Sequence, residues 1–167
     1  MSDLLIVVDM QNDFLTGVFG SKYAESVIKP LSSYAHSFSG DILFTRDTHY
    51  KNEYSTTLEG MALPLHCDEG TPGHQLCDEL LDLVKDGNVI NKPTFASVDL
   101  IEKVKDYSDI YLVGVCTDIC VISNAFLIRA HYPNKRIYVI EELCRGLNEK
   151  THDAAILVMK SCLVEIV

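Results

Sequence analysis

Short runs of apolar, mostly β-branched residues alternate along the chain with longer and more polar segments. Unbroken apolar runs are typical of parallel strands covered on both faces, because neither face of such a strand meets water. The runs predict strands at residues 4–8, 41–45, 88–90, 110–115, 136–140 and 163–166. The segments between them predict helices at 21–38, interrupted or kinked by Pro30, and at 74–85, 98–105, 118–131 and 149–160. We therefore expect an α/β fold: one three-layer αβα domain over residues 1–167, with a central, mostly parallel sheet of about six strands.

Residues 47–73 break this alternation, because they show neither strand nor helix periodicity. A loop of this length inside a compact domain is usually functional or disordered. The segment contains two histidines and several carboxylates, so its composition favours a functional role.

Composition and charge exclude several classes of function. The 167 residues include 14 Lys and Arg against 24 Asp and Glu, a formal net charge of −10. An acidic chain without a basic run argues against nucleic-acid binding. No apolar stretch reaches the ~20 residues of a membrane span, and the first residues do not resemble a signal peptide. We expect a soluble, cytoplasmic protein, in which the six cysteines are reduced, buried thiols.

Residues whose side chains can take part in catalysis follow the predicted strands. Asp9 comes directly after the first strand, and Lys92 follows the third. Either residue alone has an ordinary explanation, a strand-ending Asp or a solvated Lys. The carboxyl ends of parallel strands meet at one edge of the sheet, where ligands bind, so we expect both side chains at a shared site.

The fourth strand leads into two cysteines, Cys116 and Cys120. Thr117 or Asp118 is a suitable N-cap for the next helix, which places Cys120 in its first turn. A helix N-terminus lowers the pKa of a thiol, and its amides can donate to an oxyanion. Cys120 is therefore the predicted nucleophile, and Cys116 the structural thiol.

The second strand ends in Asp47 and His49, which lie on the same side of an extended segment and resemble the start of a metal site. His66 is the natural third ligand, and Glu53 and Glu59 compete for the fourth position. Nitrogen and oxygen ligands suit zinc, iron or manganese without distinguishing among them. The alternative is a loop that carries polar residues for solubility.

Taken together, these segments resemble the isochorismatase-like cysteine hydrolases, and most closely their nicotinamidase/pyrazinamidase branch. The matching stretches occur in family order and are residues 5–14 (LIVVDMQNDF), 45–49 (TRDTH), 64–73 (PLHCDEGTPG), 92–97 (KPTFAS) and 114–121 (GVCTDICV).

The resemblance implies a catalytic triad of Asp9, Lys92 and Cys120. It also implies a cis peptide bond between Val115 and Cys116, which turns the amides of Cys116 and Cys120 toward one oxyanion.

For the metal, the resemblance implies one divalent ion, zinc before iron or manganese, held by Asp47, His49 and His66. Many members add a histidine shortly after the Asp-x-His pair, which this chain lacks. Other members use a glutamate seven residues before the last histidine. Glu59 stands at that distance from His66, so we choose it over Glu53.

The substrate pocket implied by the resemblance contains Phe14, Leu63 and Phe95. Nicotinamidases usually sandwich the pyridine ring between the phenylalanine at position 14 and an aromatic residue at position 63. Here position 63 is a leucine, and the chain has no Trp. An aliphatic wall packs a flat ring with less stacking energy.

Three functions compete. The first is a metal-dependent amidase that converts nicotinamide to nicotinate and ammonia. The second is another amidase or carbamoyl hydrolase of the superfamily with a different acyl pocket. The third is a non-catalytic binding protein, which the intact Asp9, Lys92 and Cys120 argue against. The expected partner is a small-molecule amide, and the apolar C-terminal strand offers a surface for a homo-oligomer.

Overall fold

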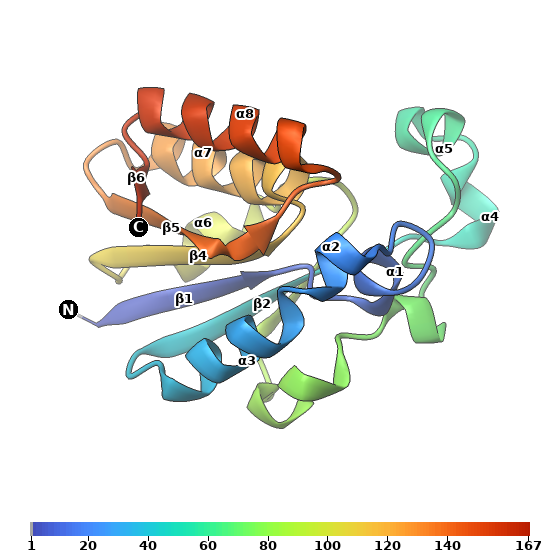
Figure 1. Ribbon diagram of the computed structural model, residues 1–167, viewed down its shortest axis with the longest axis horizontal. Helices are drawn as coiled ribbons and strands as arrows, with labels where there is room; N and C mark the ends of the chain where they lie inside the picture. The colour runs from blue at the N-terminus through green and yellow to red at the C-terminus, as the bar shows by residue number, and fades with distance from the viewer. Residues whose placement is uncertain (1) are drawn as a thin grey trace.

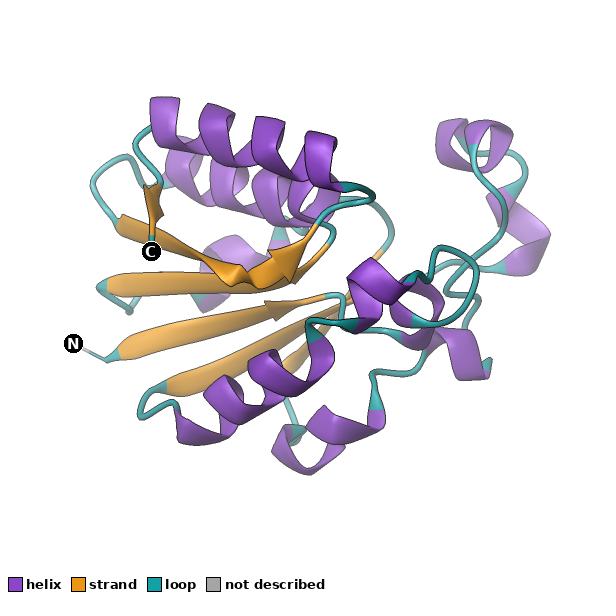
Figure 2. Cartoon of the chain, in the orientation of Figure 1, coloured by secondary structure: helices purple, strands orange, loops and turns teal. Residues whose placement is uncertain are grey.

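The computed structural model describes residues 2–167 and places a parallel sheet between two layers of helices (Figures 1 and 2). The strands are β1 (Asp3–Val8), β2 (Asp41–Asp47), β3 (Val89–Lys92), β4 (Asp109–Val115), β5 (Arg136–Arg145) and β6 (Glu165–Ile166). Their order in the sheet is β3-β2-β1-β4-β5-β6, and every neighbouring pair is parallel. The predicted three-layer α/β fold is confirmed.

The two helical layers bury opposite faces of the same strands. In β1, Leu5 and Val7 pack in the cluster beneath α3 (Ile28–Ser37) and the 3₁₀ segment η2 (Asp78–Leu83). Leu4 and Ile6 pack instead in the cluster formed with α6 (Asp99–Lys103), α7 (Ile122–His131) and α8 (Glu149–Ser161). Successive side chains of a strand point to opposite faces, which explains why β1 is apolar throughout.

The strand order reverses between β1 and β4, since β2 and β3 extend the sheet in one direction and β5 and β6 extend it in the other. In open parallel sheets this switch point is where ligands bind, beyond the carboxyl ends of the strands. Three short helices lie beyond that edge: α1 (Asn12–Leu15), α4 (Lys51–Tyr54) and α5 (Leu58–Ala62) (Figure 1). A further helix, α2 (Lys22–Glu25), precedes α3.

The prediction of one helix at 74–85 is wrong. The structure has two 3₁₀ segments there, η1 (Pro72–His74) and η2. Between them the backbone pairs with the segment after β1: Gln11 forms a bridge with Leu76, and the Cys77 N–H donates to the Met10 carbonyl at 2.8 Å. This tertiary pairing holds residues 75–77 extended and overrides the helical pattern.

Other boundaries also differ from the predicted ones. The segment predicted as one helix at 21–38 breaks between α2 and α3, and Pro30 lies in the first turn of α3, where a missing N–H is tolerated. The stretch at 47–73 contains α4 and α5, which have no apolar stripe to reveal them. The third strand begins one residue later and ends two later than predicted, β5 extends to Arg145, and β6 is shorter.

The helix predicted at 118–131 divides into a π-helical turn, η3 (Thr117–Val121), followed by α7. Neither Thr117 nor Asp118 caps it: Cys116 is the N-cap residue, and its side chain makes no cap hydrogen bond. The wider turn places Cys120 at the junction between β4 and α7. Among residues 2–167, no helix combines the length and apolar character needed to cross a membrane.

Candidate active site

The structure brings Asp9, Lys92 and Cys120 together at the switch point. The Lys92 ammonium lies 2.6 Å from Asp9 Oδ2 and 3.6 Å from Cys120 Sγ. All three side chains are buried. Asp9 leaves the β1 conformation with a φ of 47°, and its Oδ1 accepts a 2.6 Å hydrogen bond from the Thr45 hydroxyl. Lys92 therefore links the carboxylate to the thiol.

Burial and charge shift the pKa of each member of this group. Burial raises the pKa of Asp9, although the neighbouring Lys92 ammonium lowers it. Burial alone would lower the pKa of Lys92, but the charges of Asp9 and Cys120 outweigh it and raise that pKa. Lys92 is therefore an ammonium in the resting protein, and the Asp9 carboxyl binds a proton more readily than an ordinary aspartate does.

The net shift of the Cys120 pKa is upward in the resting protein, opposite to the lowering expected from a helix N-terminus. Burial and then the negative charge of Asp9 raise the pKa of this thiol well above its ordinary value, and the lowering by Lys92 does not compensate. Cys120 therefore rests as a neutral thiol and needs a base to become a nucleophile.

The peptide bond between Val115 and Cys116 is cis, as the resemblance implied. Burial, and then the charge of Asp118, also raises the pKa of the Cys116 thiol. All six cysteines are free; five are buried, as expected, but Cys162 is exposed.

A second cluster lies beside this group and contains the four predicted metal ligands. Asp47 ends β2, His49 follows it, and Glu59 and His66 come from the loop. One ligand atom from each residue lies within 4.8 Å of all the others. Glu59 joins the cluster from α5, whereas the side chain of Glu53 is exposed on α4 and is not part of it.

The distances within this cluster fit a divalent cation. Asp47 Oδ2 lies 3.0 Å from His49 Nε2 and 3.2 Å from His66 Nε2. Glu59 Oε1 lies 3.6 Å and 3.5 Å from the same two nitrogens. Two imidazole nitrogens and two carboxylate oxygens, all directed at one point, are a donor set that zinc, iron and manganese accept.

The surroundings of His66 favour the metal-binding tautomer. Its Nδ1 lies 2.9 Å from the Pro64 carbonyl, to which it donates, so Nε2 keeps its lone pair facing Asp47 and Glu59. A histidine that is oriented through its other ring nitrogen in this way is typical of metal sites. For His49, burial alone would lower the pKa, but the carboxylates of Asp47 and Glu59 raise it to about 9.

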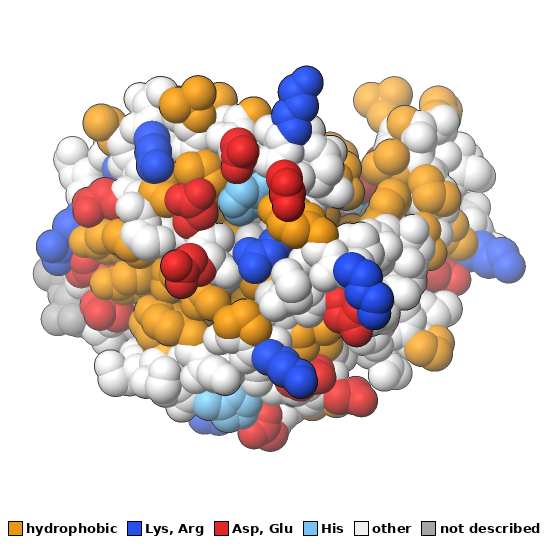
Figure 3. Space-filling view, viewed as in Figure 1, with side chains coloured by type: hydrophobic (Ala, Val, Ile, Leu, Met, Phe, Trp, Pro, Cys, Tyr) orange, Lys and Arg blue, Asp and Glu red, His pale blue; other side chains and the backbone are white. Residues whose placement is uncertain are grey.

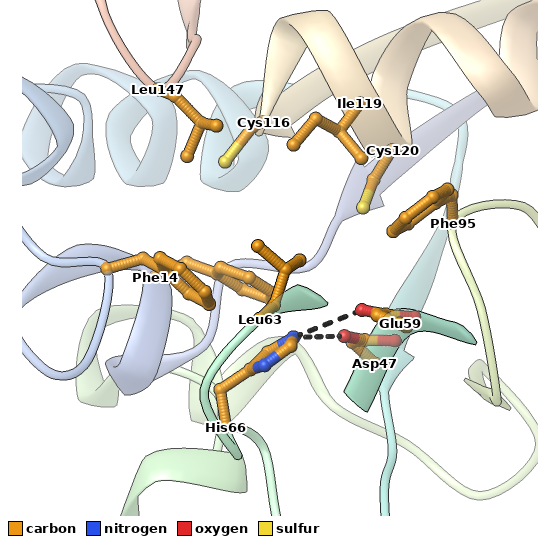
Figure 4. Close-up of a pocket in the computed structure, with 11 residues that line it drawn as sticks. Phe14, Asp47, Glu59, Leu63, His66, Phe95, Cys116, Ile119, Cys120 and Leu147 are labelled. Atoms are coloured by element: carbon orange, nitrogen blue, oxygen red, sulfur yellow. Dashed lines mark hydrogen bonds and ion pairs between the residues drawn. The ribbon is translucent and has the colours of Figure 1, made fainter. Parts of the chain in front are cut away.

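A cavity of about 400 Å³ opens between the two clusters (Figure 4). Cys116, Ile119, Cys120 and Leu147 lie along one side, and Phe14, Leu63 and His66 lie along the other. Phe95 stands beside Cys120, while Asp47 and Glu59 close the metal end. The three predicted pocket residues, Phe14, Leu63 and Phe95, all line this cavity.

A comparison with known families identifies the chain. Residues 3–167 match the model of the isochorismatase domain. The chain belongs to the isochorismatase family.

Individual relatives of this isochorismatase-family protein are amidases by name. A nicotinamidase of Schizosaccharomyces pombe is 25% identical, over 98% of this chain and 91% of the relative. A nicotinamidase of Saccharomyces cerevisiae is 29% identical, over 72% of this chain and 78% of the relative. The crystal structure of a pyrazinamidase of Pyrococcus horikoshii in complex with zinc has a TM-score of 0.87 and 27% identity, and covers 100% of this chain and 99% of that one. By these comparisons the chain is an amidohydrolase.

Gln11 is a site residue of this isochorismatase-family protein that the sequence analysis did not single out. Where β1 turns away at Asp9, the Gln11 carboxamide takes over the pairing with β2: Oε1 accepts from the Asp47 N–H at 2.7 Å, and Nε2 donates to the Asp47 carbonyl at 2.8 Å. The buried side chain thus replaces a peptide group and fixes the backbone of Asp47. Its position three residues after the end of β1 was the available signal.

The pocket also contains an aromatic residue that sequence reasoning missed. Phe19 lies with its ring 6.1 Å from that of Phe14, nearly parallel at 15°, and 4.8 Å from the ring of His66. It extends the aromatic wall formed by Phe14 on the side of the pocket where position 63 is aliphatic. No motif marks it, because it lies in an irregular segment after α1.

Proposed function

We propose that this amidohydrolase is a metal-dependent cysteine enzyme that converts nicotinamide and water to nicotinate and ammonia. One observation carries the proposal. The Cys120 thiol, which contacts a lysine ammonium paired with a buried carboxylate, lines the same pocket as Asp47, Glu59 and His66 of the two-histidine, two-carboxylate cluster. This combination supports acyl transfer to a thiol next to a cation that orients the substrate.

Asp47, His49, Glu59 and His66 would hold the divalent ion. Zinc is the proposed ion, supported by the donor set and by the zinc in the Pyrococcus horikoshii pyrazinamidase. When bound, the ion supplies a Lewis acid that can hold a ring nitrogen of the substrate.

The cavity suits a small planar amide. Phe14 and Phe19 offer ring faces and edges, and Leu63 offers an aliphatic surface. A flat ring packed against these side chains would direct its amide across the pocket toward Cys120.

Acylation begins with a proton transfer from the Cys120 thiol to Asp9, whose raised pKa lets it hold that proton inside the protein. Lys92 stabilises the thiolate and keeps Asp9 oriented. As the Cys120 sulfur bonds to the amide carbon, the carbonyl electron pair becomes an oxyanion, for which the backbone N–H groups of Cys116 and Cys120 are the proposed donors. Asp9 returns its proton to the nitrogen, the carbon–nitrogen bond breaks, and ammonia leaves.

Deacylation uses the same residues in the opposite sense. Asp9 takes a proton from a water molecule while the oxygen of that water attacks the thioester carbon. The carbon–sulfur bond then breaks, nicotinate is released, and the proton on Asp9 returns to the Cys120 thiolate. Asp9 and Lys92 thus end each cycle in their starting protonation states.

Ammonia release from nicotinamide, pyrazinamide and several linear carbamoyl compounds, each with and without a chelator, tests the proposal. The expected result is turnover of the two ring amides that is lost on chelation and restored by zinc. Turnover of the linear compounds alone would replace nicotinamidase by a hydrolase with a different acyl specificity, which the aliphatic Leu63 favours. Activity that a chelator leaves unchanged would mean that the reaction does not need the metal.

A further inference from the structure

A buried asparagine joins the turn that carries the nucleophile to the loop that carries Phe95. Asn124 lies in α7, one turn after Cys120, and its side chain is fully buried. The neighbouring inward-facing residues of α7, Ala125 and Ile128, are apolar. Asparagine has a low helix propensity, and a buried amide is costly unless it is hydrogen-bonded. Its presence at a core position therefore needs a reason.

The hydrogen bonds of Asn124 supply that reason. Its Nδ2 donates to the Cys120 carbonyl at 2.8 Å and to the Phe95 carbonyl at 3.3 Å. Its Oδ1 accepts from the Ser97 N–H at 3.0 Å. One side chain thus ties the backbone of the nucleophile to a loop that is more than twenty residues away in sequence.

That loop, residues 93–98, connects β3 to α6 and carries two features of the site. The Thr94 carbonyl accepts a 3.0 Å hydrogen bond from the Lys92 ammonium, and the Phe95 side chain lines the pocket beside Cys120 (Figure 4). The side chains of Thr94 and Phe95 are exposed, so the loop is not held by burial at these residues.

We propose that Asn124 is a positioning residue for the reaction: it sets the distance between the Cys120 turn and the loop that orients Lys92 and carries Phe95. The proposal rests on the proposed function only in taking Cys120 as the nucleophile and the pocket as the substrate site. A displacement of about 1 Å at such a site reduces a rate by roughly 100-fold. Loss of the Asn124 hydrogen bonds should therefore reduce the rate of the reaction by more than the loss of stability explains.

The test compares Asn124→Ala with Asn88→Ala in the metal-loaded protein. Asn88 is a matched control at the opposite end of the sheet. Its Nδ2 also donates to two carbonyls, those of Ile42 and Leu83, and its Oδ1 also accepts one N–H, that of Lys85. Each substitution removes two donated hydrogen bonds and one accepted hydrogen bond, but only Asn124 touches the site.

We expect kcat/KM for nicotinamide to fall about 10- to 100-fold in Asn124→Ala and to stay within twofold of the parent in Asn88→Ala. Combining Asn124→Ala with Phe95→Leu should give a KM change smaller than the product of the single changes, because both act on the same wall. Metal content should be unchanged. Equal losses in the two alanine variants, or unchanged kinetics in Asn124→Ala, would overturn the proposal.

A second variant and a second measurement keep the proposal testable if Asn124→Ala does not fold. Asn124→Ser retains a hydroxyl that can bond the Cys120 carbonyl one turn back but does not span to the loop, so it should lose activity even if Asn124→Ala does not fold. Hydrogen exchange at residues 93–98 does not depend on the substrate and should accelerate in the Asn124 variants alone. If the parent protein does not hydrolyse nicotinamide, the proposed function fails, but hydrogen exchange still tests whether Asn124 holds the loop at 93–98. Unchanged exchange in the Asn124 variants overturns the proposal itself.

Discussion

Replacing Lys92 by Met removes the charge at the centre of the site while keeping a chain of similar shape. The ammonium is fully buried and contacts Asp9 at 2.6 Å and Asp47 at 3.4 Å. Removing one partner of a buried ion pair costs about 3–5 kcal/mol, because the remaining charge stays buried without compensation. For a chain of this size each kcal/mol shifts Tm by about 2–4 °C, so Lys92→Met should lower Tm by about 6–20 °C. Activity should fall to background.

The pH dependence of this variant has a definite sign. Burial already raises the pKa of Asp9 in the folded parent, and loss of Lys92 raises it further. The folded state then binds a proton that the unfolded state releases, so the free energy of unfolding falls as pH rises through the window above the ordinary Asp pKa. The deficit of Lys92→Met relative to the parent should shrink as the pH is lowered from 7 toward 5.

The double variant Asp9→Asn/Lys92→Met separates charge burial from chemistry. It removes both charges, so it should recover part of the lost stability and none of the activity. The assay is denaturant unfolding of metal-saturated protein at several pH values, together with ammonia release. Lys105→Met, which removes a charge from an exposed pair with Glu102, is the control and should leave the unfolding midpoint unchanged. A Lys92→Met protein as stable as the parent, or a double variant less stable than Lys92→Met, would refute the reasoning.

Three further predictions concern the nucleophile, the metal and the pocket. Cys120→Ala should lose more than about 10⁴-fold in kcat and form no acyl adduct by mass spectrometry of quenched reactions, while Cys116→Ala keeps most activity; full turnover by Cys120→Ala would exclude the thioester. Glu59→Gln should weaken zinc binding in a chelator competition by more than the ~10–100-fold typical of changes outside the ligand set. Glu53→Gln should leave zinc binding unchanged. If Glu53→Gln weakens zinc binding more than Glu59→Gln does, Glu53 is the fourth ligand. Phe19→Ala should raise KM for nicotinamide about 2- to 10-fold with little change in kcat, and an unchanged KM would remove its ring from the substrate wall.

The sequence predicts the sheet well because its strands are buried on both faces, which leaves uninterrupted apolar runs. It also predicts where the site forms, since the carboxyl ends of parallel strands share one edge. The association of Asp9 with Lys92 follows from this rule. The environment of Cys120 does not follow from it, because only the packed structure shows that burial and the charge of Asp9 raise the pKa of this thiol.

The failures occur where tertiary contacts, and not periodicity, decide the local structure. Residues 75–77 have a helical pattern but pair with the chain after β1. The reverse holds for α5, which is helical although it buries no residue and exposes Leu58 and Met61 at 87% and 71%. Helix α5 stands on the projecting part of the molecule (Figure 1), where hydrophobic surface is visible beside a notch (Figure 3). Such a helix has no amphipathic signature to detect.

The charges explain why the two clusters belong to one site. Asp47 directs one carboxylate oxygen to the Lys92 ammonium, and the other to the histidines of the metal cluster. Around it, the carboxylates of Asp9, Asp47 and Glu59 face a single ammonium and two histidines that must be neutral to bind a metal. Buried charge is tolerated only when it is compensated. A divalent cation held by the cluster would bring this group to neutrality, and the charge state of the triad would then be linked to the occupancy of the metal cluster through Asp47.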